Sequence, residues 1–174
     1  PFKTFLHELK KNIYLRISHE LYLKRLIIGG FDKVFEIGKN FRNEGIDRTH
    51  NPEFTMMECY QAYADYNDMM RLAEELISFV AKKVVGKAKI EYQGRVIDLT
   101  PPWKRLTMAQ GLKQEGIDVE SISDEELKKL LKQQGIEVQP FVRGKAIAEL
   151  FEKLVQPKLI QPTFVMDYPL QTTP

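Results

Sequence analysis

The chain has 174 residues, of which 43% are hydrophobic and 29% are charged, so its composition excludes a disordered tail and predicts one folded domain over residues 1–174. No uninterrupted apolar stretch approaches the roughly 20 residues that cross a bilayer, and a net charge of +2, from 26 basic and 24 acidic residues, gives no general case for binding to nucleic acid or to a membrane. The single cysteine, Cys59, excludes an internal disulfide and a cysteine-based zinc site, so we expect a cytoplasmic protein.

The first predicted elements are a strand and a helix. Residues 13–17 alternate apolar and polar side chains and are rich in β-formers, which predicts a strand. Ser18 is expected to cap the helix that follows, because a serine before a run with helical spacing satisfies free N–H groups. The helical spacing continues to Ile28, and Gly29 ends the helix.

Two longer strands follow, and they are predicted to pair. Their alternating patterns span residues 33–41 and 53–64. The segment between them, 42–52, is polar and contains Gly45 and Pro52. We therefore expect an antiparallel hairpin with a long loop.

The rest of the chain alternates helices with short strands. Apolar side chains recur at helical spacing between Asn67 and Gly86, which predicts an amphipathic helix. A short hairpin is expected to join residues 89–92 with 95–99. Three further helices and one strand are predicted at residues 107–114, 123–134, 144–156 and 163–167. Antiparallel strands with segregated helices predict an α+β fold in which an antiparallel β-sheet is flanked by helices.

The long hairpin carries the residues that point to chemistry. Side chains alternate between the two faces of a strand, so Arg42 is grouped with Phe54, Glu58 and Tyr60 on one face. Ionised groups on such a face need a partner or a ligand. An arginine offers a planar fork that suits phosphate or carboxylate, and His50 in the loop adds a donor for a polyphosphate. Phe54, just past the loop, is suited to stack on a base.

Structural interpretations of the same residues stay open. A hairpin with Arg and Glu on one face is commonly a solvated face with cross-strand ion pairs. In that interpretation His50 is a plain turn residue, and Glu20, in the first turn of a helix, is a favourable partner of the helix dipole. His7 and His19 lack carboxylate or cysteine neighbours at metal-ligand spacing, so no metal site is predicted within the chain.

Three segments together form a long and specific motif. Residues 14–26 read Tyr-Leu-Arg-Ile-Ser-His-Glu-Leu-Tyr-Leu-Lys-Arg-Leu, residues 40–45 read Asn-Phe-Arg-Asn-Glu-Gly, and residues 50–58 read His-Asn-Pro-Glu-Phe-Thr-Met-Met-Glu. These segments resemble the class II lysyl-tRNA synthetases. Residues 41–58 are similar to motif 2 of that class, with its Phe-Arg-x-Glu signature. The resemblance covers nearly the whole chain, and it implies part of a class II catalytic core.

The resemblance implies an ATP site and a lysine site. The motif 2 arginine that contacts the ATP α-phosphate, the residue that acts in catalysis, falls on Arg42, and the glutamate near the adenine falls on Glu44. The loop histidine that reaches the terminal phosphates falls on His50, and the phenylalanine that stacks on the adenine falls on Phe54. The implied lysine-binding residues are Glu20, Arg42, Glu58 and Tyr60.

The resemblance also implies a reaction and its partners. In this family the lysine carboxylate attacks the α-phosphorus of ATP, and the lysyl group then passes to the 3′ end of tRNA(Lys). ATP, lysine, tRNA(Lys), Mg²⁺ and a homodimeric full-length enzyme are therefore implied. The chain starts after the place of motif 1 and stops before that of the acidic magnesium ligands and the motif 3 arginine. We therefore expect an internal part of a catalytic domain, with the Mg²⁺ ligands outside it.

Two other functions remain compatible with the same residues. One is a synthetase-like paralogue that attaches lysine to a protein such as an elongation factor. The other is an inactive module that keeps the ATP-binding fold as an interaction domain. The first alternative shares the ATP and lysine sites and differs in the acceptor, whereas the second predicts ATP binding without catalysis.

Overall fold

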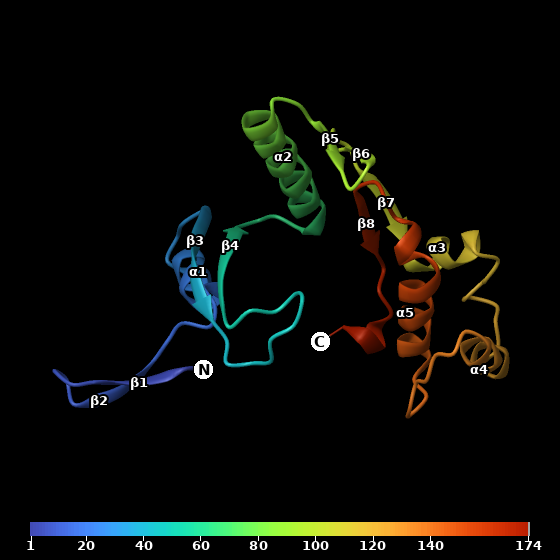
Figure 1. Ribbon diagram of the computed structural model, residues 1–174, viewed down its shortest axis with the longest axis horizontal. Helices are drawn as coiled ribbons and strands as arrows, with labels where there is room; N and C mark the ends of the chain where they lie inside the picture. The colour runs from blue at the N-terminus through green and yellow to red at the C-terminus, as the bar shows by residue number, and fades with distance from the viewer. Residues whose placement is uncertain (174) are drawn as a thin grey trace. The chain divides into compact units, whose positions relative to one another are not determined.

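The computed structural model describes residues 1–173, and the chain divides into two compact units, Pro1–Asp65 and Tyr66–Pro174 (Figure 1). The mixture of helices and small sheets confirms the predicted α+β class. The prediction of one domain over residues 1–174 stays a prediction. No helix in the described part of the chain combines the length and the apolar character needed to cross a membrane.

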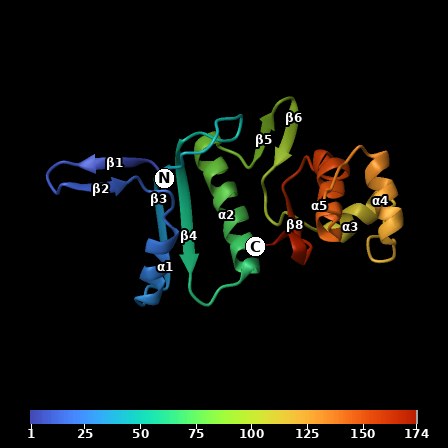
Figure 2. The same ribbon diagram turned by 90° about the horizontal axis from the view of Figure 1, so that it is seen from below.

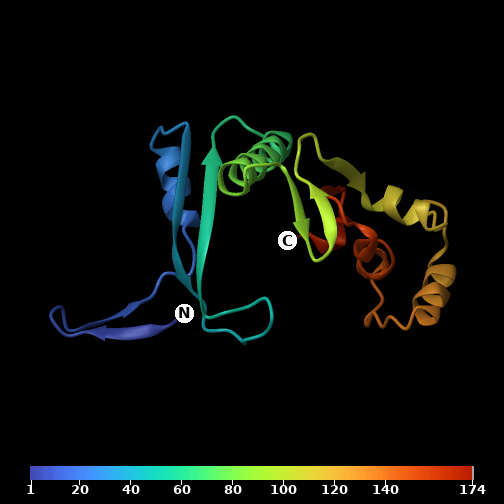
Figure 3. The same ribbon diagram turned by 45° about the horizontal axis from the view of Figure 1, so that its top comes forward.

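The first unit contains two antiparallel hairpins and one helix (Figures 1 and 3). Its elements are β1 (Lys3–Leu6), β2 (Lys11–Tyr14), α1 (Glu20–Ile28), β3 (Lys33–Phe41) and β4 (Glu53–Gln61). Figure 3 shows α1 running alongside the β3–β4 hairpin, with β1 and β2 extending away from its base. This unit contains every residue predicted to bind ATP or lysine.

The β3–β4 hairpin confirms the predicted long antiparallel pair. Lys33 is opposite Gln61 at one end, and Phe41 is opposite Glu53 at the other. The second strand ends at Gln61 rather than at residue 64. Tyr63 has a φ of 55°, in the left-handed region, so its backbone cannot continue the extended conformation.

The N-terminal hairpin differs from the prediction. The strand predicted at residues 13–17 is β2, which starts at Lys11 and ends at Tyr14. Its partner β1 was not predicted. The turn between them places Lys10 at a φ of 48°, a conformation for which glycine or asparagine is the usual sequence signal, and the turn has neither. Beyond β2, the carbonyl of Arg16 accepts a hydrogen bond from the Phe41 N–H at 2.7 Å, so the chain there follows β3.

The start of α1 also differs from the prediction. The N-cap residue is His19, whose side chain makes no capping hydrogen bond, so the prediction of Ser18 as the cap is wrong by one position. The Ser18 hydroxyl nevertheless accepts a hydrogen bond from the Glu20 N–H at 3.1 Å. At the other end the helix stops at Ile28 as predicted, and Gly30 follows with a φ of 101°.

One face of the β3–β4 hairpin carries charged and polar side chains among apolar ones, and it is partly buried. The cross-strand pairs on this face are Val34 with Tyr60, Glu36 with Glu58, Gly38 with Met56 and Asn40 with Phe54. This register confirms that Phe54, Glu58 and Tyr60 share one face, whereas Arg42 lies just beyond the end of β3. His19 and Asn40 are fully buried there. A Cβ at Gly38 would lie 2.5 Å from a terminal nitrogen of Arg16, so glycine leaves the space that this side chain occupies.

The second unit is built from a long helix, short strands and a helical core (Figure 2). Its elements are α2 (Tyr66–Val85), β5 (Lys89–Tyr92), β6 (Arg95–Asp98), β7 (Lys104–Thr107), α3 (Met108–Gln114), α4 (Asp124–Gln133), α5 (Arg143–Leu154), β8 (Thr163–Met166) and the 3₁₀ turns Gln156–Lys158 and Leu170–Thr172. Fully buried leucines of β7, α3, α4 and α5 form the core: Leu106, Leu112, Leu127 and Leu150. A Cβ at Gly111 would lie 2.5 Å from the Phe151 ring, so glycine permits close packing of α3 on α5.

The strand pairing of the second unit is only partly as predicted. The β5–β6 hairpin is confirmed, with β6 one residue shorter than expected. The strand β8 is also confirmed, but it pairs in parallel with β7, a strand that was not predicted. The expectation of purely antiparallel pairing is therefore wrong for this pair. Parallel neighbours need a long crossover, and a four-residue strand such as β7 gives little periodicity to detect.

A buried ion pair fixes α2 within the second unit. Glu74 is only 4% exposed, and its carboxylate accepts hydrogen bonds from Arg105 Nη1 at 2.8 Å and Nη2 at 3.1 Å. The Trp103 N–H donates to the same carboxylate at 2.9 Å. The Arg105 hydrogen bonds, followed by that from Trp103, lower the pKa of Glu74 against the opposing effect of burial. The charged form of Glu74 therefore stabilises the folded state.

Replacing Glu74 with glutamine is expected to lower the free energy of unfolding by about 2 kcal/mol at pH 7, since hydrogen bonds to charged groups contribute about 1.5–3 kcal/mol. Urea unfolding followed by the fluorescence of Trp103, the single tryptophan, measures this loss. The exposed neighbour Glu75, changed to glutamine, is the matched control. Because the folded-state pKa lies below the ordinary 4.5, the contribution is complete above 4.5 and disappears as the pH falls through the folded value. Equal stabilities at pH 7 would contradict this role.

Candidate active site

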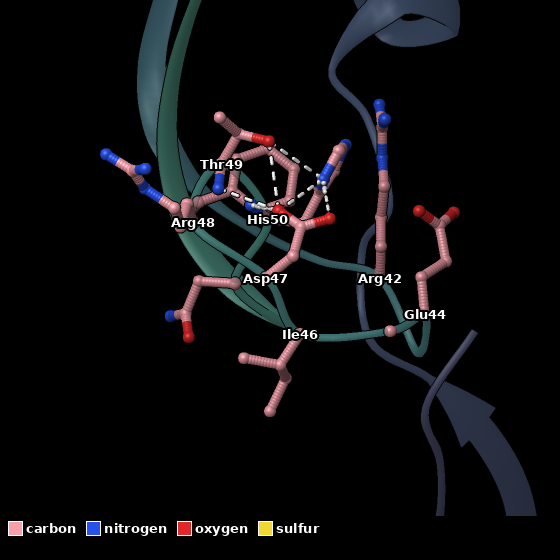
Figure 4. A pocket seen from close by; sticks show the side chains of 10 residues that line it. Arg42, Glu44, Ile46, Asp47, Arg48, Thr49 and His50 are labelled. Atoms are coloured by element: carbon pink, nitrogen blue, oxygen red, sulfur yellow. Dashed lines mark hydrogen bonds and ion pairs between the residues drawn. The ribbon is translucent and has the colours of Figure 1, made fainter.

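The loop between β3 and β4 encloses a cavity of about 400 Å³. It is lined by Arg42, Glu44, Gly45, Ile46, Asp47, Arg48, Thr49, His50, Asn51 and Phe54. The four residues predicted to bind ATP are all in this set. Figure 4 shows Arg42 and Glu44 extending in the same direction from the loop, while Asp47, Thr49 and His50 converge on one another.

Arg42 is anchored at the root of the loop. Its backbone N–H donates to the Pro52 carbonyl at 2.9 Å, which closes the loop where the two strands separate. Its side-chain Nε donates to the Ile17 carbonyl at 3.2 Å. The guanidinium carbon lies 5.4 Å from the centre of the Phe54 ring, within cation–π range. These contacts orient the exposed arginine side chain beside the aromatic ring.

Asp47 stabilises the middle of the loop through its carboxylate, a role that was not predicted from the sequence. Its carboxylate accepts hydrogen bonds from the N–H groups of Thr49 at 2.7 Å and His50 at 2.9 Å, and His50 Nδ1 lies 2.8 Å from its second oxygen. These hydrogen bonds, led by that from Thr49, lower the pKa of Asp47. The signal was present as an aspartate two residues before a threonine, the spacing of an Asx-turn. The turn and the contact of Nδ1 with the carboxylate together orient the His50 ring.

A second group of predicted residues lies where α1 starts against β4. Glu58 is half-buried, and its two carboxylate oxygens each accept a hydroxyl hydrogen bond, from Ser18 at 3.0 Å and from Tyr60 at 3.1 Å. Burial, the hydrogen bond to Glu58 and the negative charges of Glu58 and Glu20 raise the pKa of Tyr60 to about 12. Tyr60 therefore stays protonated and donates to Glu58 throughout the physiological pH range.

The charges around Glu58 leave it available to a cation. Its cross-strand partner Glu36 is paired with Arg16 and lies 3.3 Å from the Nδ1 atom of His19. Glu20 pairs with Lys24 on the exposed side of α1. Within residues 1–173 no lysine, arginine or histidine forms an ion pair with Glu58. Its carboxylate is thus oriented by two neutral hydroxyl donors and not by a cationic one.

The predicted site residues therefore form two neighbouring groups. Arg42, Glu44, His50 and Phe54 line the loop cavity, whereas Glu20, Glu58 and Tyr60 gather at the start of α1. The segment before α1 connects the groups, because Ile17 holds Arg42 and the next residue, Ser18, holds Glu58. The loop cavity, with Arg42 at its root, thus lies near a carboxylate that no cationic side chain pairs with among residues 1–173.

No group of three or more His, Cys, Asp or Glu side chains that would hold a metal is found between residues 1 and 173. Of the acids at the loop cavity, Asp47 is already engaged by Thr49 and His50. The Mg²⁺ implied by the resemblance is therefore not assigned to residues of this chain.

Comparison with known proteins identifies the family of the chain. Residues 1–174 match the family model for "tRNA synthetases class II (D, K and N)". Proteins named lysine–tRNA ligase from Clostridium botulinum (strain Loch Maree / Type A3), Chloroflexus aurantiacus and Saccharolobus solfataricus are 51%, 53% and 56% identical to the chain over 180, 177 and 177 residues. Each alignment covers 100% of this chain and 36% of the relative, so the chain spans about a third of the length of these proteins. The chain therefore belongs to the class II tRNA synthetases of the D, K and N group.

Proposed function

We propose that the chain supplies the ATP-binding and lysine-binding part of a lysine–tRNA ligase. The observation that carries the proposal is the anchoring of Arg42 and Glu58 by adjacent residues, Ile17 and Ser18. Through these adjacent residues, an oriented guanidinium and a carboxylate with no cationic partner among residues 1–173 belong to one part of the first unit. The two side chains suit the two substrates of the proposed reaction: Arg42 suits the α-phosphate of ATP, and Glu58 suits the ammonium of an amino acid.

The proposed reaction is adenylate formation. The lysine carboxylate attacks the α-phosphorus of ATP, the bond to the bridging oxygen breaks, and pyrophosphate leaves. No side-chain nucleophile is required, because positioning and electrostatic stabilisation carry phosphoryl transfer of this kind. Arg42 neutralises the charge that develops on the α-phosphate, and Phe54 stacks on the adenine with Glu44 near its edge. His50, oriented by Asp47, contacts the terminal phosphates.

The lysine end of the site follows from the acidic group. Glu58 and Glu20 supply negative charge for an ammonium, and Tyr60 keeps the Glu58 carboxylate oriented. In the proposed second step the lysyl group passes to tRNA(Lys). The proposal also includes two properties of the longer enzyme: it forms a homodimer, as the family resemblance implies, and it is located in the cytoplasm.

Binding of a hydrolysis-resistant lysyl-adenylate analogue tests the proposal. The lysyl sulfamoyl-adenosine analogue is expected to bind the chain at least about tenfold more tightly than the norleucyl analogue, which has the same carbon chain without the ε-ammonium. Isothermal titration calorimetry measures both affinities. Equal affinities would contradict selection of lysine. Binding of ATP with no binding of lysine would instead favour the inactive ATP-binding module.

A further inference from the structure

Ser18 is a residue to which neither the sequence analysis nor the family resemblance gave a role in the site. It is half-buried, and its hydroxyl donates to Glu58 Oε1 at 3.0 Å while accepting from the Glu20 N–H at 3.1 Å. We propose that Ser18 is a positioning residue of the lysine site that orients the carboxylate of Glu58. This inference rests on the proposed function, because it assumes that Glu58 binds the ammonium.

The carboxylate of Glu58 needs such a partner to have one orientation. The terminal torsion of a glutamate side chain is broad, so an unrestrained carboxylate samples many angles. Here the Ser18 hydroxyl occupies Oε1 and the Tyr60 hydroxyl occupies Oε2. One hydroxyl on each oxygen fixes the plane of the carboxylate. An ionised carboxylate accepts about four hydrogen bonds, so acceptor sites remain for an ammonium.

Ser18 is itself held by the residues on both sides. The Arg16 carbonyl accepts from the Phe41 N–H at 2.7 Å, and the Ile17 carbonyl accepts from Arg42 Nε at 3.2 Å. On the other side, His19 is fully buried with its Nε2 atom 3.2 Å from the Met56 carbonyl oxygen. The residues around Ser18 are thus bonded to β3 through Arg16, to the start of the β3–β4 loop through Ile17, and to β4 through His19. The Ser18 hydroxyl is therefore preorganised and loses little conformational freedom when a ligand binds.

A neutral donor has a specific advantage at this place. Glu36, the cross-strand partner of Glu58, is paired with Arg16, and its charge is compensated. A cationic donor on Glu58 would compensate that carboxylate too and would leave nothing to attract the substrate. The hydroxyls of Ser18 and Tyr60 orient the carboxylate and preserve its charge. The two hydroxyls therefore fix the orientation of the Glu58 carboxylate, and its charge remains available to attract the ammonium of the ligand.

Four variants of the chain, titrated with lysine and with ATP, test the proposal: Ser18→Ala, Ser18→Thr, Glu58→Gln and the double variant of Ser18→Ala with Glu58→Gln. Ser18→Ala is expected to weaken lysine binding about tenfold and to change ATP affinity less than about twofold, because a hydrogen bond to a charged group is lost from the lysine site alone. Ser18→Thr keeps the hydroxyl and should restore most of the lysine affinity. In a Glu58→Gln background, Ser18→Ala should add less than about twofold, because its effect passes through the charge of Glu58.

The possible outcomes separate the inference from the function on which it rests. If Glu58→Gln leaves lysine affinity unchanged, the lysine site is wrong and the role of Ser18 falls with it. If Glu58→Gln weakens lysine binding and Ser18→Ala does not, only the positioning role is overturned. Equal losses of lysine and ATP affinity in Ser18→Ala, with a lower melting temperature, would show a structural role in starting α1 and would also overturn it.

Discussion

Replacing Arg42 with alanine is expected to weaken ATP binding by about 10- to 100-fold, the largest effect of any single change in the loop. A charge-assisted hydrogen bond contributes about 1.5–3 kcal/mol, and about 1.4 kcal/mol corresponds to a factor of ten. Arg42 is already oriented by the Ile17 carbonyl and the Phe54 ring, so little of its binding energy is lost in ordering the side chain. Calorimetric titration with ATP measures the change.

Two further variants show which property of Arg42 matters. Arg42→Lys keeps the positive charge but loses the planar fork and the Nε donor to Ile17, so an intermediate affinity is expected. Arg25→Ala removes an exposed arginine of α1, which lies against the Tyr22 ring outside the loop cavity, and should change ATP affinity less than about twofold. If Arg42→Ala binds ATP as well as the unchanged chain, the loop cavity is not the nucleotide site.

The sequence predicted the parts of the site that depend on regular alternation. The β3–β4 hairpin alternates along both strands, so the parity of Phe54, Glu58 and Tyr60 already assigned them to one face, and the observed register agrees. The loop bounds followed from Gly45 and Pro52 between two apolar patterns. The similarity to motif 2 then implied which residues of that loop and face bind ATP and lysine. The strand alternation and the family motif selected the same residues, because both are carried by the eighteen-residue segment 41–58.

The features that the sequence did not predict depend on contacts between distant segments. The strand β7 forms because β8, some sixty residues later, lies parallel to it, and no local pattern encodes that pairing. The turn at Lys10 takes a left-handed conformation in a residue that rarely adopts one. Ser18 was predicted from its neighbours as a helix cap, whereas its hydroxyl donates to Glu58, forty residues away. Such a contact becomes visible only after the hairpin packs against α1.

At the other end of the site, Glu58→Gln is expected to weaken lysine binding by about 10- to 100-fold while ATP affinity changes less than about twofold. The substitution keeps the size of the side chain and removes its charge. The amide also has one oxygen where the carboxylate has two, so it cannot accept from Ser18 and Tyr60 on separate oxygens. Chemical shift changes of the β3–β4 hairpin during titration with lysine, and separately with ATP, measure the two affinities.

Matched variants on the same strand separate charge from orientation. Glu53→Gln removes an exposed carboxylate of β4 that pairs with Lys39, and it should leave lysine affinity within about twofold. Tyr60→Phe removes one hydroxyl but keeps the charge of Glu58, so a loss of about tenfold is expected, the same as for Ser18→Ala and at the low end of the range for Glu58→Gln. Because the pKa of Tyr60 is raised to about 12, this donor does not ionise near neutral pH, and the difference between Tyr60→Phe and the unchanged chain should be the same at pH 7 and pH 9. A lysine affinity that survives Glu58→Gln but falls with Glu53→Gln would move the ammonium site to the opposite end of β4.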